Sequence, residues 1–181
     1  MLRHKGQSID LGGIAKGYAA DEVKTILKRN NIDNAIIDLG GNIYALGSAP
    51  DGPLWKIGIQ DPLKERGEVV GALSLSNKSV VTSGGYERYF EKNGKIFHHI
   101  MNPKTGYPCS NGTISATIIS DFSIDGDALA TCVFVMGFEK GLRLLESQEG
   151  IDAILINNDR EVFATSGIKD SFTLLNKEYS Y

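Results

Sequence analysis

The chain has 181 residues, which is the length of one domain or of two small ones. Apolar residues make up 41% of it and charged residues 23%, a composition that excludes intrinsic disorder and permits a substantial core. The net charge of −3 argues against a broad surface for nucleic acid or anionic membranes. No apolar run is long enough to cross a bilayer, and the first residues lack the apolar stretch of a signal peptide.

Glycine is the most unusual component, with 21 residues that cluster in pairs. Paired glycines without a repeat indicate tight turns, or backbone that approaches a ligand closely. The two cysteines, Cys109 and Cys132, are too few for a disulfide framework and have no metal-ligand spacing. They are either two ordinary thiols or one bridge, and they do not decide the compartment.

The pattern of apolar residues predicts an α+β fold. Residues 14–31 carry apolar side chains at helical spacing, with cations at the C-terminal end where they suit the helix dipole. Strand patterns follow at 34–41, 42–47, 55–62, 68–76, 79–85 and 113–120, and 95–108 is an apolar run that enters a Pro/Gly turn. Further on come two helices, 125–137 and 138–148, that meet near Gly137, and a closing hairpin of 152–158 and 161–166. Because the strands are grouped, we expect an antiparallel or mixed sheet with two or three helices packed on it.

One short motif occurs twice, since Ile9–Gly13 and Ile37–Gly41 share the sequence IDLGG. Two interpretations stay open: two strands with similar end-turns, or two glycine-rich turns that present backbone N–H groups to a polar ligand. The first copy precedes the predicted helix over 14–31, and Lys16 lies in the first turn of that helix. A helix N-terminus favours phosphate, and Lys16 adds a full positive charge. The segment is neither a P-loop nor a Rossmann fingerprint, because both glycine patterns fail.

Asp127 and Thr131 are spaced to share one face of a helix whose other faces are apolar. An unpaired charge in such a helix is costly, so the carboxylate needs a partner. A carboxylate and a hydroxyl are hard oxygen ligands of the kind that Mg²⁺ prefers, together with water and phosphate. The alternative is a structural role, with Asp125 or Asp127 as the N-cap of the helix and Thr131 bonding back to the backbone.

His98 and His99 precede a Pro/Gly turn, in a position where catalytic loops often lie. Adjacent residues of a strand face opposite sides, so one of them can enter a given site and act as a general base. The alternative is one packed and one solvated histidine, and zinc is not expected because no third ligand is suitably spaced. Thr82–Tyr86 predicts a turn that binds phosphate or a ribityl chain, or else a plain hairpin turn, and Ser83 lacks the frame of a hydrolase nucleophile.

Six motifs occur in order and cover about residues 7–165: IDLGGIAKGYAADEV, DLGGNIYALG, W-x-IGIQDP, VVTSGGYERYF, HHIMNPKTGYP and DALATCVFVMG. Together they resemble the FAD:protein FMN transferases of the ApbE family. The resemblance implies one ApbE-like, T-fold-related domain over 1–181. It implies an enzyme with FAD as substrate and Mg²⁺ as cofactor, which transfers the FMN moiety to a Thr or Ser hydroxyl of an acceptor protein and releases AMP. Acceptors in the family are subunits of redox-driven membrane complexes and extracellular flavin-binding domains, so we expect a location outside the cytoplasm, membrane-associated in the full-length protein.

The resemblance also assigns roles to residues. It implies that the backbone oxygen of Ala15 and the side chains of Asp127 and Thr131 are metal ligands. His99, directly before Ile100, is implied as the base near the acceptor hydroxyl. The wall around the FAD phosphates and ribityl chain is implied to consist of Asp10, Gly12, Gly13, Lys16, Asp38, Gly40, Gly41, Thr82, Ser83 and Gly84.

The sequence departs from the family pattern at two points. Asn102 stands where many members have Asp. Members also carry a substantial region before the first motif, with an export or lipoprotein signal and contacts to the rings of FAD, so we expect this chain to be truncated relative to the family. Two alternatives to the transferase follow: a Mg²⁺-dependent FAD pyrophosphatase that yields FMN and AMP, and a non-catalytic remnant or lobe that binds flavin.

Overall fold

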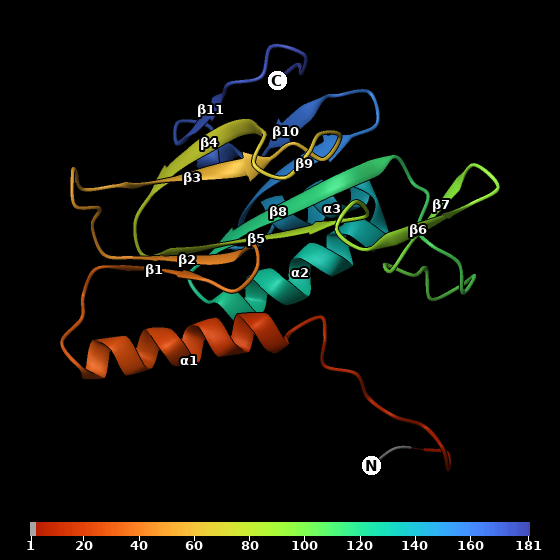
Figure 1. The fold of residues 1–181 in the computed structure, drawn as a ribbon, viewed down its shortest axis with the longest axis horizontal. Coiled ribbons are helices and arrows are strands. Elements are labelled where there is room, and N and C mark those ends of the chain that lie inside the picture. Colours follow the sequence, from red (N-terminus) through yellow and green to blue (C-terminus); the bar gives the residue numbers. More distant parts are fainter. Residues whose placement is uncertain (1–2) are drawn as a thin grey trace.

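A six-stranded antiparallel sheet lies at the centre of the structure, a computed structural model that describes residues 3–181 (Figure 1). Its strands follow the spatial order β1-β2-β5-β8-β9-β10. They are β1 (Ala35–Asp38), β2 (Asn42–Leu46), β5 (Lys78–Gly84), β8 (Thr113–Ser120), β9 (Asp152–Asn157) and β10 (Val162–Ala164). Strand β8 is buried along almost its whole length, because both faces of the sheet are covered there.

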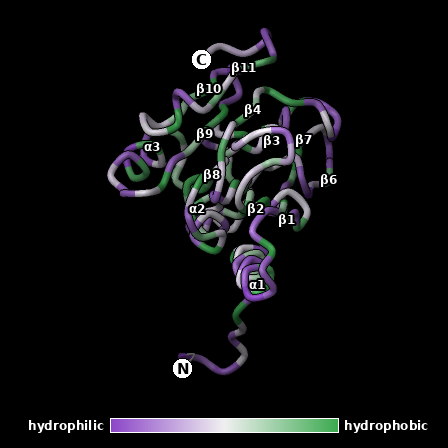
Figure 2. Tube along the Cα trace, turned by 90° about the vertical axis from the view of Figure 1, so that its left-hand side faces the viewer, coloured by the Kyte–Doolittle hydropathy of each residue, from purple (hydrophilic) through white to green (hydrophobic). Residues whose placement is uncertain are grey.

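Helices cover one face of this sheet. They are α1 (Ala15–Arg29), α2 (Ser123–Met136) and α3 (Phe138–Glu146). Helix α2 packs on β8, where Val133 and Phe134 meet Ala116 and Ile118 in one buried cluster. Helix α1 lies outside α2 and strands β1 and β2, and the residues before it extend away from the sheets (Figures 1 and 2). Helix α2 is therefore enclosed between α1 and the sheet, which explains why its sequence is apolar on most sides.

A smaller sheet covers the other face. Its antiparallel strands are β3 (Trp55–Gln60), β4 (Val69–Leu75) and β11 (Phe172–Leu174), in the order β11-β4-β3. Ile57 and Leu73 of this sheet share a buried cluster with Val80 and Ile119 of the central sheet. The core thus has three layers: helices, the six-stranded sheet and the three-stranded sheet.

A hairpin of β6 (Tyr89–Lys92) and β7 (Lys95–His98) projects beyond the end of the central sheet (Figure 1). Its turn uses Asn93 and Gly94, whose φ angles of 52° and 69° lie in the left-handed region that the tight turns of hairpins require. The rings of Phe90 and Phe97 stack across the two strands with centroids 5.2 Å apart. Strand β6 was not predicted, and the apolar run over 95–108 is a strand only as far as His98.

The predicted fold class is confirmed, because the sheets are antiparallel and three helices pack on them. The helix predicted over 14–31 spans Ala15–Arg29, and the break between the later helices lies at Gly137, whose φ is +82°. The interpretation of the two IDLGG copies as similar strands is wrong for the first copy. Residues 9–13 form no strand, and Ile9 is exposed, whereas Ile37 is buried in β1.

Two further expectations concern the surface and the thiols. Within residues 3–181, none of the helices combines the length and apolar character that a membrane crossing requires. Cys109 is buried, Cys132 is exposed, and both are free. The two cysteines are therefore ordinary thiols, and the alternative of a bridge between them is wrong.

Candidate active site

Helix α1 meets helix α2 at Gly17. The amide N–H of Gly17 donates a hydrogen bond to Oδ2 of Asp127 at 2.8 Å. This N–H belongs to the first turn of α1, where amides have no partner within the helix. A methyl group on Gly17 would lie 2.6 Å from Ile124 Cα and 2.8 Å from Asp127 Cβ, and nearer still to the Ser123 carbonyl oxygen. The two backbones can approach this closely only because residue 17 is glycine.

The carboxylate of Asp127 lies in a buried environment. Its side chain is buried, with 5% of the residue exposed. Burial raises its pKa, while the Gly17 amide and the charge of Lys16 act in the opposite direction. A cation beside this carboxylate would offset the cost of burying its charge.

The predicted N-cap role of Asp125 or Asp127 in α2 is wrong, because both residues lie inside the helix. Helix α2 begins at Ser123, so Asp125 lies in its first turn and Asp127 one position beyond Gly126. The amides of Ser123 and Ile124 donate to Oδ1 and Oδ2 of Asp21 in α1, each at 3.0 Å. Phe122 occupies the N-cap position of α2, so Asp21 accepts the first amides of α2 from outside the helix, and Asp127 in turn accepts a first-turn amide of α1.

Thr131 lies one helical turn beyond Asp127 and faces β5. Its hydroxyl is 3.1 Å from Ser83 Oγ, so it pairs across to the sheet instead of bonding back to its own helix. Thr82 points to the opposite face of the sheet, where its hydroxyl is 2.8 Å from that of Thr117. Both turn interpretations of Thr82–Tyr86 are wrong for the first three residues, since β5 continues through Gly84. The structure therefore joins Ser83 to Thr131 and separates Thr82 from it.

The two glycine-rich segments are turns organised by their aspartates. Asp10 Oδ1 accepts the amide of Gly12 at 2.6 Å, just before α1. Asp38 Oδ1 accepts the amide of Gly41 at 2.9 Å, in the turn from β1 to β2. Gly40 and Gly41 have φ angles of +67° and +88°, which explains why this turn needs glycine. In both copies the aspartate accepts an amide of the glycine pair, but Asp10 accepts that of the first glycine and Asp38 that of the second.

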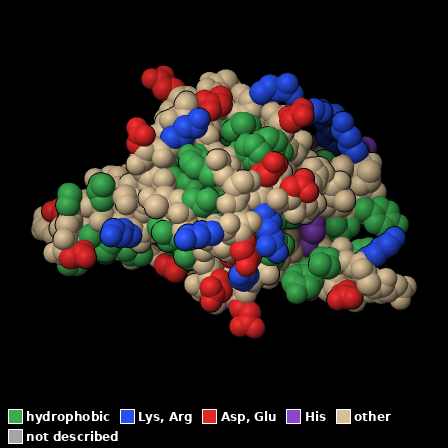
Figure 3. Space-filling model, turned by 90° about the horizontal axis from the view of Figure 1, so that it is seen from above, with side chains coloured by type: hydrophobic (Ala, Val, Ile, Leu, Met, Phe, Trp, Pro, Cys, Tyr) green, Lys and Arg blue, Asp and Glu red, His purple; other side chains and the backbone are tan. Residues whose placement is uncertain are grey.

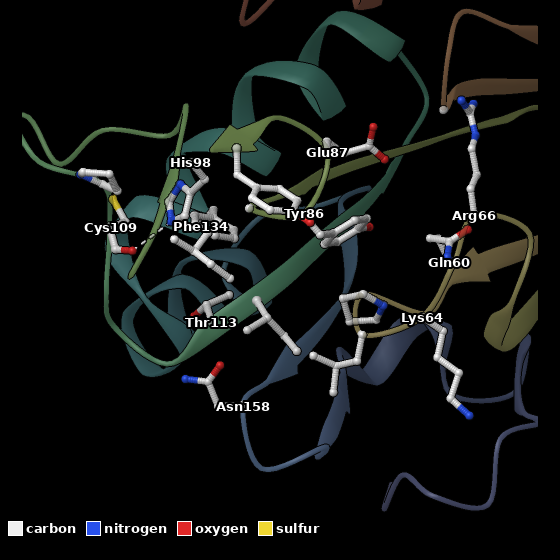
Figure 4. A pocket seen from close by; sticks show the side chains of 18 of the residues that line it. Gln60, Lys64, Arg66, Tyr86, Glu87, His98, Cys109, Thr113, Phe134 and Asn158 are labelled. Atoms are coloured by element: carbon white, nitrogen blue, oxygen red, sulfur yellow. Dashed lines mark hydrogen bonds between the residues drawn. The ribbon is translucent and has the colours of Figure 1, made fainter. Parts of the chain in front are cut away.

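A cleft of about 1910 Å³ is formed by the β3–β4 connection, the β6–β7 hairpin and residues 107–114. The lining side chains labelled in Figure 4 include Gln60, Lys64 and Arg66 on one side, Tyr86 in the middle, and His98, Cys109 and Phe134 on the other. Asp38 and Gly41 also line it, whereas Asp127, Thr131 and Ser83 are absent from the lining within the part of the chain that the structure describes. Seen from the side of the smaller sheet, hydrophobic side chains gather near the middle of the surface, with both acidic and basic side chains around them (Figure 3).

Polar atoms without partners gather beside this cleft. The hydroxyls of Tyr86, Thr113 and Ser115 are buried, and within residues 3–181 none of them has a hydrogen-bond partner. Burial raises the pKa of Tyr86 to about 12, and the nearby Ser115 hydroxyl opposes this shift although the two groups do not reach hydrogen-bond geometry. Such groups are unusual in a folded interior, and a ligand or water in the cleft could satisfy them.

The structure distinguishes the two adjacent histidines. Both ring nitrogens of His98 are engaged, because Nε2 is 3.0 Å from the Cys109 carbonyl oxygen and Nδ1 accepts the amide of Ile100 at 3.3 Å. Its ring also meets that of Phe134 edge to face, with centroids 5.6 Å apart. His98 therefore lines the cleft as a fixed, structural histidine.

His99 is exposed, and its Nδ1 lies 3.2 Å from the carbonyl oxygen of Arg88. A carbonyl oxygen can only accept, so this contact assigns the proton of the neutral ring to Nδ1 and leaves the lone pair on Nε2. Among the described residues nothing bonds to Nε2, so His99 has the free nitrogen that a general base needs. In the following turn, Asn102 Oδ1 accepts the amide of Lys104 at 2.9 Å, a role that Asp fills equally well.

The donor set around Asp127 suits a hard cation. Within residues 3–181, no group of three or more His, Cys, Asp or Glu side chains gathers in a way that could hold a metal ion by itself. The candidate ligands are instead one buried carboxylate, the Thr131 hydroxyl and the carbonyl of Ala15 in the first turn of α1. Few protein oxygens are what Mg²⁺ uses when water and substrate phosphates complete its shell, so these residues fit that ion.

The ApbE family model matches residues 1–155. The chain belongs to the ApbE family. A protein of Klebsiella pneumoniae named FAD:protein FMN transferase is 42% identical over 178 residues, which is 98% of this chain and 54% of that protein. A protein of the same name from Treponema pallidum is 41% identical over 98% of this chain and 51% of its own length. The chain thus spans about half the length of these curated relatives.

Solved structures show the same fold. The ApbE protein of Thermotoga maritima superimposes with a TM-score of 0.83 at 34% identity, over 92% of this chain and 54% of that one. The apo form of the Pseudomonas stutzeri flavinyl transferase ApbE gives a TM-score of 0.75 at 30% identity, over 91% of this chain and 51% of its own. The antiparallel sheets and three helices described above are therefore an ApbE fold.

Sequence reasoning about this ApbE chain missed two residues beside the site. Asp21 lies 102 positions before Ser123, so no local pattern links the cap to the helix that it closes. Tyr86 was included only as the end of a turn, and its buried hydroxyl follows from the packing of β5 against the cleft. The sequence offered no signal for the cap, since the helix was predicted from 125 with its own aspartate as the cap, whereas it begins at Ser123 after Phe122, which offers no side-chain cap.

Proposed function

We propose that this chain carries the catalytic centre for transfer of the FMN moiety of FAD to a Thr or Ser hydroxyl of an acceptor protein. The acceptor oxygen forms a bond to the FMN phosphorus, the phosphoanhydride bond to AMP breaks, and the hydroxyl proton leaves to a base. AMP is the leaving group, so the reaction needs no oxidant or reductant. The proposal rests on one observation above all: the buried carboxylate of Asp127 is fixed at the N-terminus of α1. It lies one helical turn from Thr131, whose hydroxyl pairs with that of Ser83.

The chain's own residues fit the phosphate side of this reaction. Asp127, Thr131 and the Ala15 carbonyl would hold Mg²⁺, which when bound neutralises charge on the pyrophosphate and is typically worth several kcal/mol. Lys16 and the first-turn amides of α1 would bind phosphate oxygens, since a helix N-terminus attracts anions. The glycine-rich turns at Gly12–Gly13 and Gly40–Gly41, together with Ser83, would surround the rest of the pyrophosphate and ribityl chain.

His99 is the proposed base. Its Nδ1 is held by the Arg88 carbonyl oxygen, which orients the ring and leaves Nε2 to accept the proton of the acceptor hydroxyl. General-base help of this kind contributes about 10²–10⁴-fold to a rate. His98, with both nitrogens engaged, is excluded from this role by its hydrogen bonds.

The names of the relatives support a protein acceptor, because several are called FAD:protein FMN transferase. We propose that the acceptor belongs to a redox-driven membrane complex or to an extracellular flavin-binding domain, and that the reaction takes place outside the cytoplasm. Offering purified domains of both kinds, with FAD and Mg²⁺, tests which of them gains mass.

Intact-mass spectrometry of an acceptor domain tests the function directly. The domain is incubated with this chain, FAD and Mg²⁺, with EDTA as one control and the Asp127→Ala variant as another. Asp125→Ala is the matched variant, because Asp125 carries the same charge on the same helix but is exposed. An added FMN mass that EDTA and Asp127→Ala abolish, and Asp125→Ala keeps, supports the transferase. Free FMN and AMP without a modified acceptor would indicate the pyrophosphatase, and untouched FAD would contradict both.

A further inference from the structure

Helices α1 and α2 each supply one carboxylate that accepts N-terminal amides of the other helix. Asp127 of α2 accepts the first-turn amide of Gly17 in α1 at 2.8 Å. Asp21, one turn further along α1, accepts the amides of Ser123 and Ile124 at the start of α2, both at 3.0 Å. Each helix therefore satisfies N–H groups of the other that have no partner within their own helix. These reciprocal hydrogen bonds fix the position of α2 along α1.

The charge of Asp21 is itself held in place. Lys24 Nζ lies 3.0 Å from Asp21 Oδ1, and both side chains are largely buried, at 12% and 16% exposed. The same ammonium group donates to the carbonyl of Asp121 at 3.3 Å and lies 4.3 Å from the centre of the Tyr44 ring. The carboxylate of Asp21 is thus oriented by a paired cation, and its two oxygens are directed at the two amides of α2.

Ser123 provides a second attachment for the start of α2. Its hydroxyl donates to Asn42 Oδ1 at 2.6 Å and lies 2.9 Å from Ser79 Oγ. These contacts attach α2 to β2 and β5 but not to α1. Asp21 is therefore the side chain of α1 that accepts the first amides of α2. Lys24 of the same helix contacts the residues just before α2, through the Asp121 carbonyl at 3.3 Å and the Phe122 ring at 4.9 Å.

We propose that Asp21 is a positioning residue, which sets the register between α1 and α2 and thereby places the Asp127 carboxylate at Gly17. Asp21 acts through Asp127 and does not itself contact a substrate. This inference rests on the proposed function only where it says that the positioned carboxylate serves FMN transfer. The geometric claim, that the contact between Gly17 and Asp127 depends on Asp21, stands without it.

Amide hydrogen exchange of the full chain tests the geometric claim. In Asp21→Ala, the Ser123 and Ile124 amides should exchange faster because they lose their acceptors. If Asp21 positions Asp127, the Gly17 amide should also exchange about 10-fold faster or more, although it has no direct contact with Asp21. Asp125→Ala should leave all three amides unchanged, and Ile118 of β8 reports whether the core stays folded. Faster exchange at Ser123 and Ile124 with an unchanged Gly17 would overturn the proposal, since Asp21 would then be a cap only.

A titration with Mn²⁺ alone, followed by the loss of its free EPR signal, links the geometry to the site. Residues that orient a metal ligand typically affect metal affinity by about 10- to 100-fold. Asp21→Ala should weaken Mn²⁺ binding by about 10-fold, Asp125→Ala should not, and Asp127→Ala should abolish it. Unchanged Mn²⁺ affinity in Asp21→Ala would count against the positioning role. Equal affinity in wild type and Asp127→Ala would instead overturn the metal site, while the exchange data at Gly17 still decide the role of Asp21. If Asp21→Ala fails to fold, Asp21→Asn, which keeps one acceptor oxygen, allows the same two measurements.

Discussion

Gly17 and Asp127 are joined by a 2.8 Å hydrogen bond although 110 residues separate them in the sequence. The bond exists because a residue without a side chain lets the first turn of α1 come against the backbone of α2. The bond fixes Oδ2 of Asp127 at the N-terminus of α1, the same helix terminus that carries Lys16. The contact between these two residues is the centre of the candidate site, and it also sets how closely α1 and α2 pack.

Gly17→Ala should destabilise the chain by about 1–3 kcal/mol, because the added methyl group overlaps the backbone of α2. Glycine to alanine inside a helix otherwise stabilises by roughly 0.5–1 kcal/mol, so the sign is reversed here. Urea unfolding measures the change. Gly13→Ala is the control, since a methyl group there meets no atom within 4 Å. Equal stabilities for both variants would show that the helices do not approach as closely as described.

Thr131→Val should weaken Mg²⁺ binding by about 10-fold, because it removes a hydroxyl ligand and leaves Ser83 Oγ without its partner. Thr82→Val is the matched change on the other face of β5, where it breaks the hydrogen bond to Thr117. It should lower stability slightly and leave Mg²⁺ binding unchanged. The shift of the unfolding temperature with Mg²⁺ concentration measures both. A larger loss of binding in Thr82→Val would reverse the assignment of the two residues.

His99→Ala should slow FMN transfer by about 10²–10⁴-fold and leave the unfolding temperature close to that of wild type, since the side chain is exposed. His98→Ala should lower the unfolding temperature, because it removes the ring that bonds to the Cys109 carbonyl oxygen and packs on Phe134. Single-turnover rates and thermal unfolding of both variants separate the two roles. Normal transfer by His99→Ala would mean that the proton goes elsewhere.

Tyr86 and Tyr179 should respond in opposite directions to the same change. Tyr86→Phe removes a buried hydroxyl without a partner among the described residues, so stability at pH 7 should rise by about 1 kcal/mol. Tyr179 donates to the buried carboxylate of Asp61 at 2.6 Å, and Tyr179→Phe should cost about 1–3 kcal/mol. Urea unfolding at pH 7 compares the two variants directly.

The pH dependence of stability gives a second reading of Tyr86. Its pKa is raised from 10.0 to about 12, so the folded chain resists losing a proton that the unfolded chain loses more easily. The phenol is neutral in both states below pH 10, so through Tyr86 the free energy of unfolding decreases only as the pH rises from 10 to about 12. Wild type should therefore lose stability in this range more steeply than Tyr86→Phe. Parallel curves for the two proteins would show that the phenol is solvated in the folded state.

Local patterns predicted most of the fold, and the missing parts have physical reasons. The predicted strand over 113–120 matches β8, and the helix break at Gly137 follows from a backbone conformation that favours glycine. Strand β6 was missed although Asn93–Gly94 is a strong hairpin signal, because its four residues are exposed and do not alternate between apolar and polar side chains. The layering could not be predicted, since it depends on which apolar faces meet across long stretches of sequence.

The candidate site was predicted in part for a similar reason. The spacing of Asp127 and Thr131 identified a polar face on an apolar helix, and the structure places that face against Gly17 and Ser83. The capping of α2 by Asp21 and the occupied nitrogens of His98 depend on residues that are distant in sequence or on backbone carbonyls. Neither kind of partner leaves a mark in local residue spacing.

Helix α1 is the outermost layer, and the central sheet is sandwiched without it between α2 with α3 and the smaller sheet (Figure 1). We therefore expect α1 to detach at a lower free energy than that of global unfolding. Such a subglobal opening would remove the Gly17 amide and Lys16 from Asp127 while leaving the carboxylate on an intact α2. A ligand that contacts both helices should hold α1 in place and make this segment more resistant to proteolysis. Cleavage within α1 would then report occupancy of the site while the core stays unchanged.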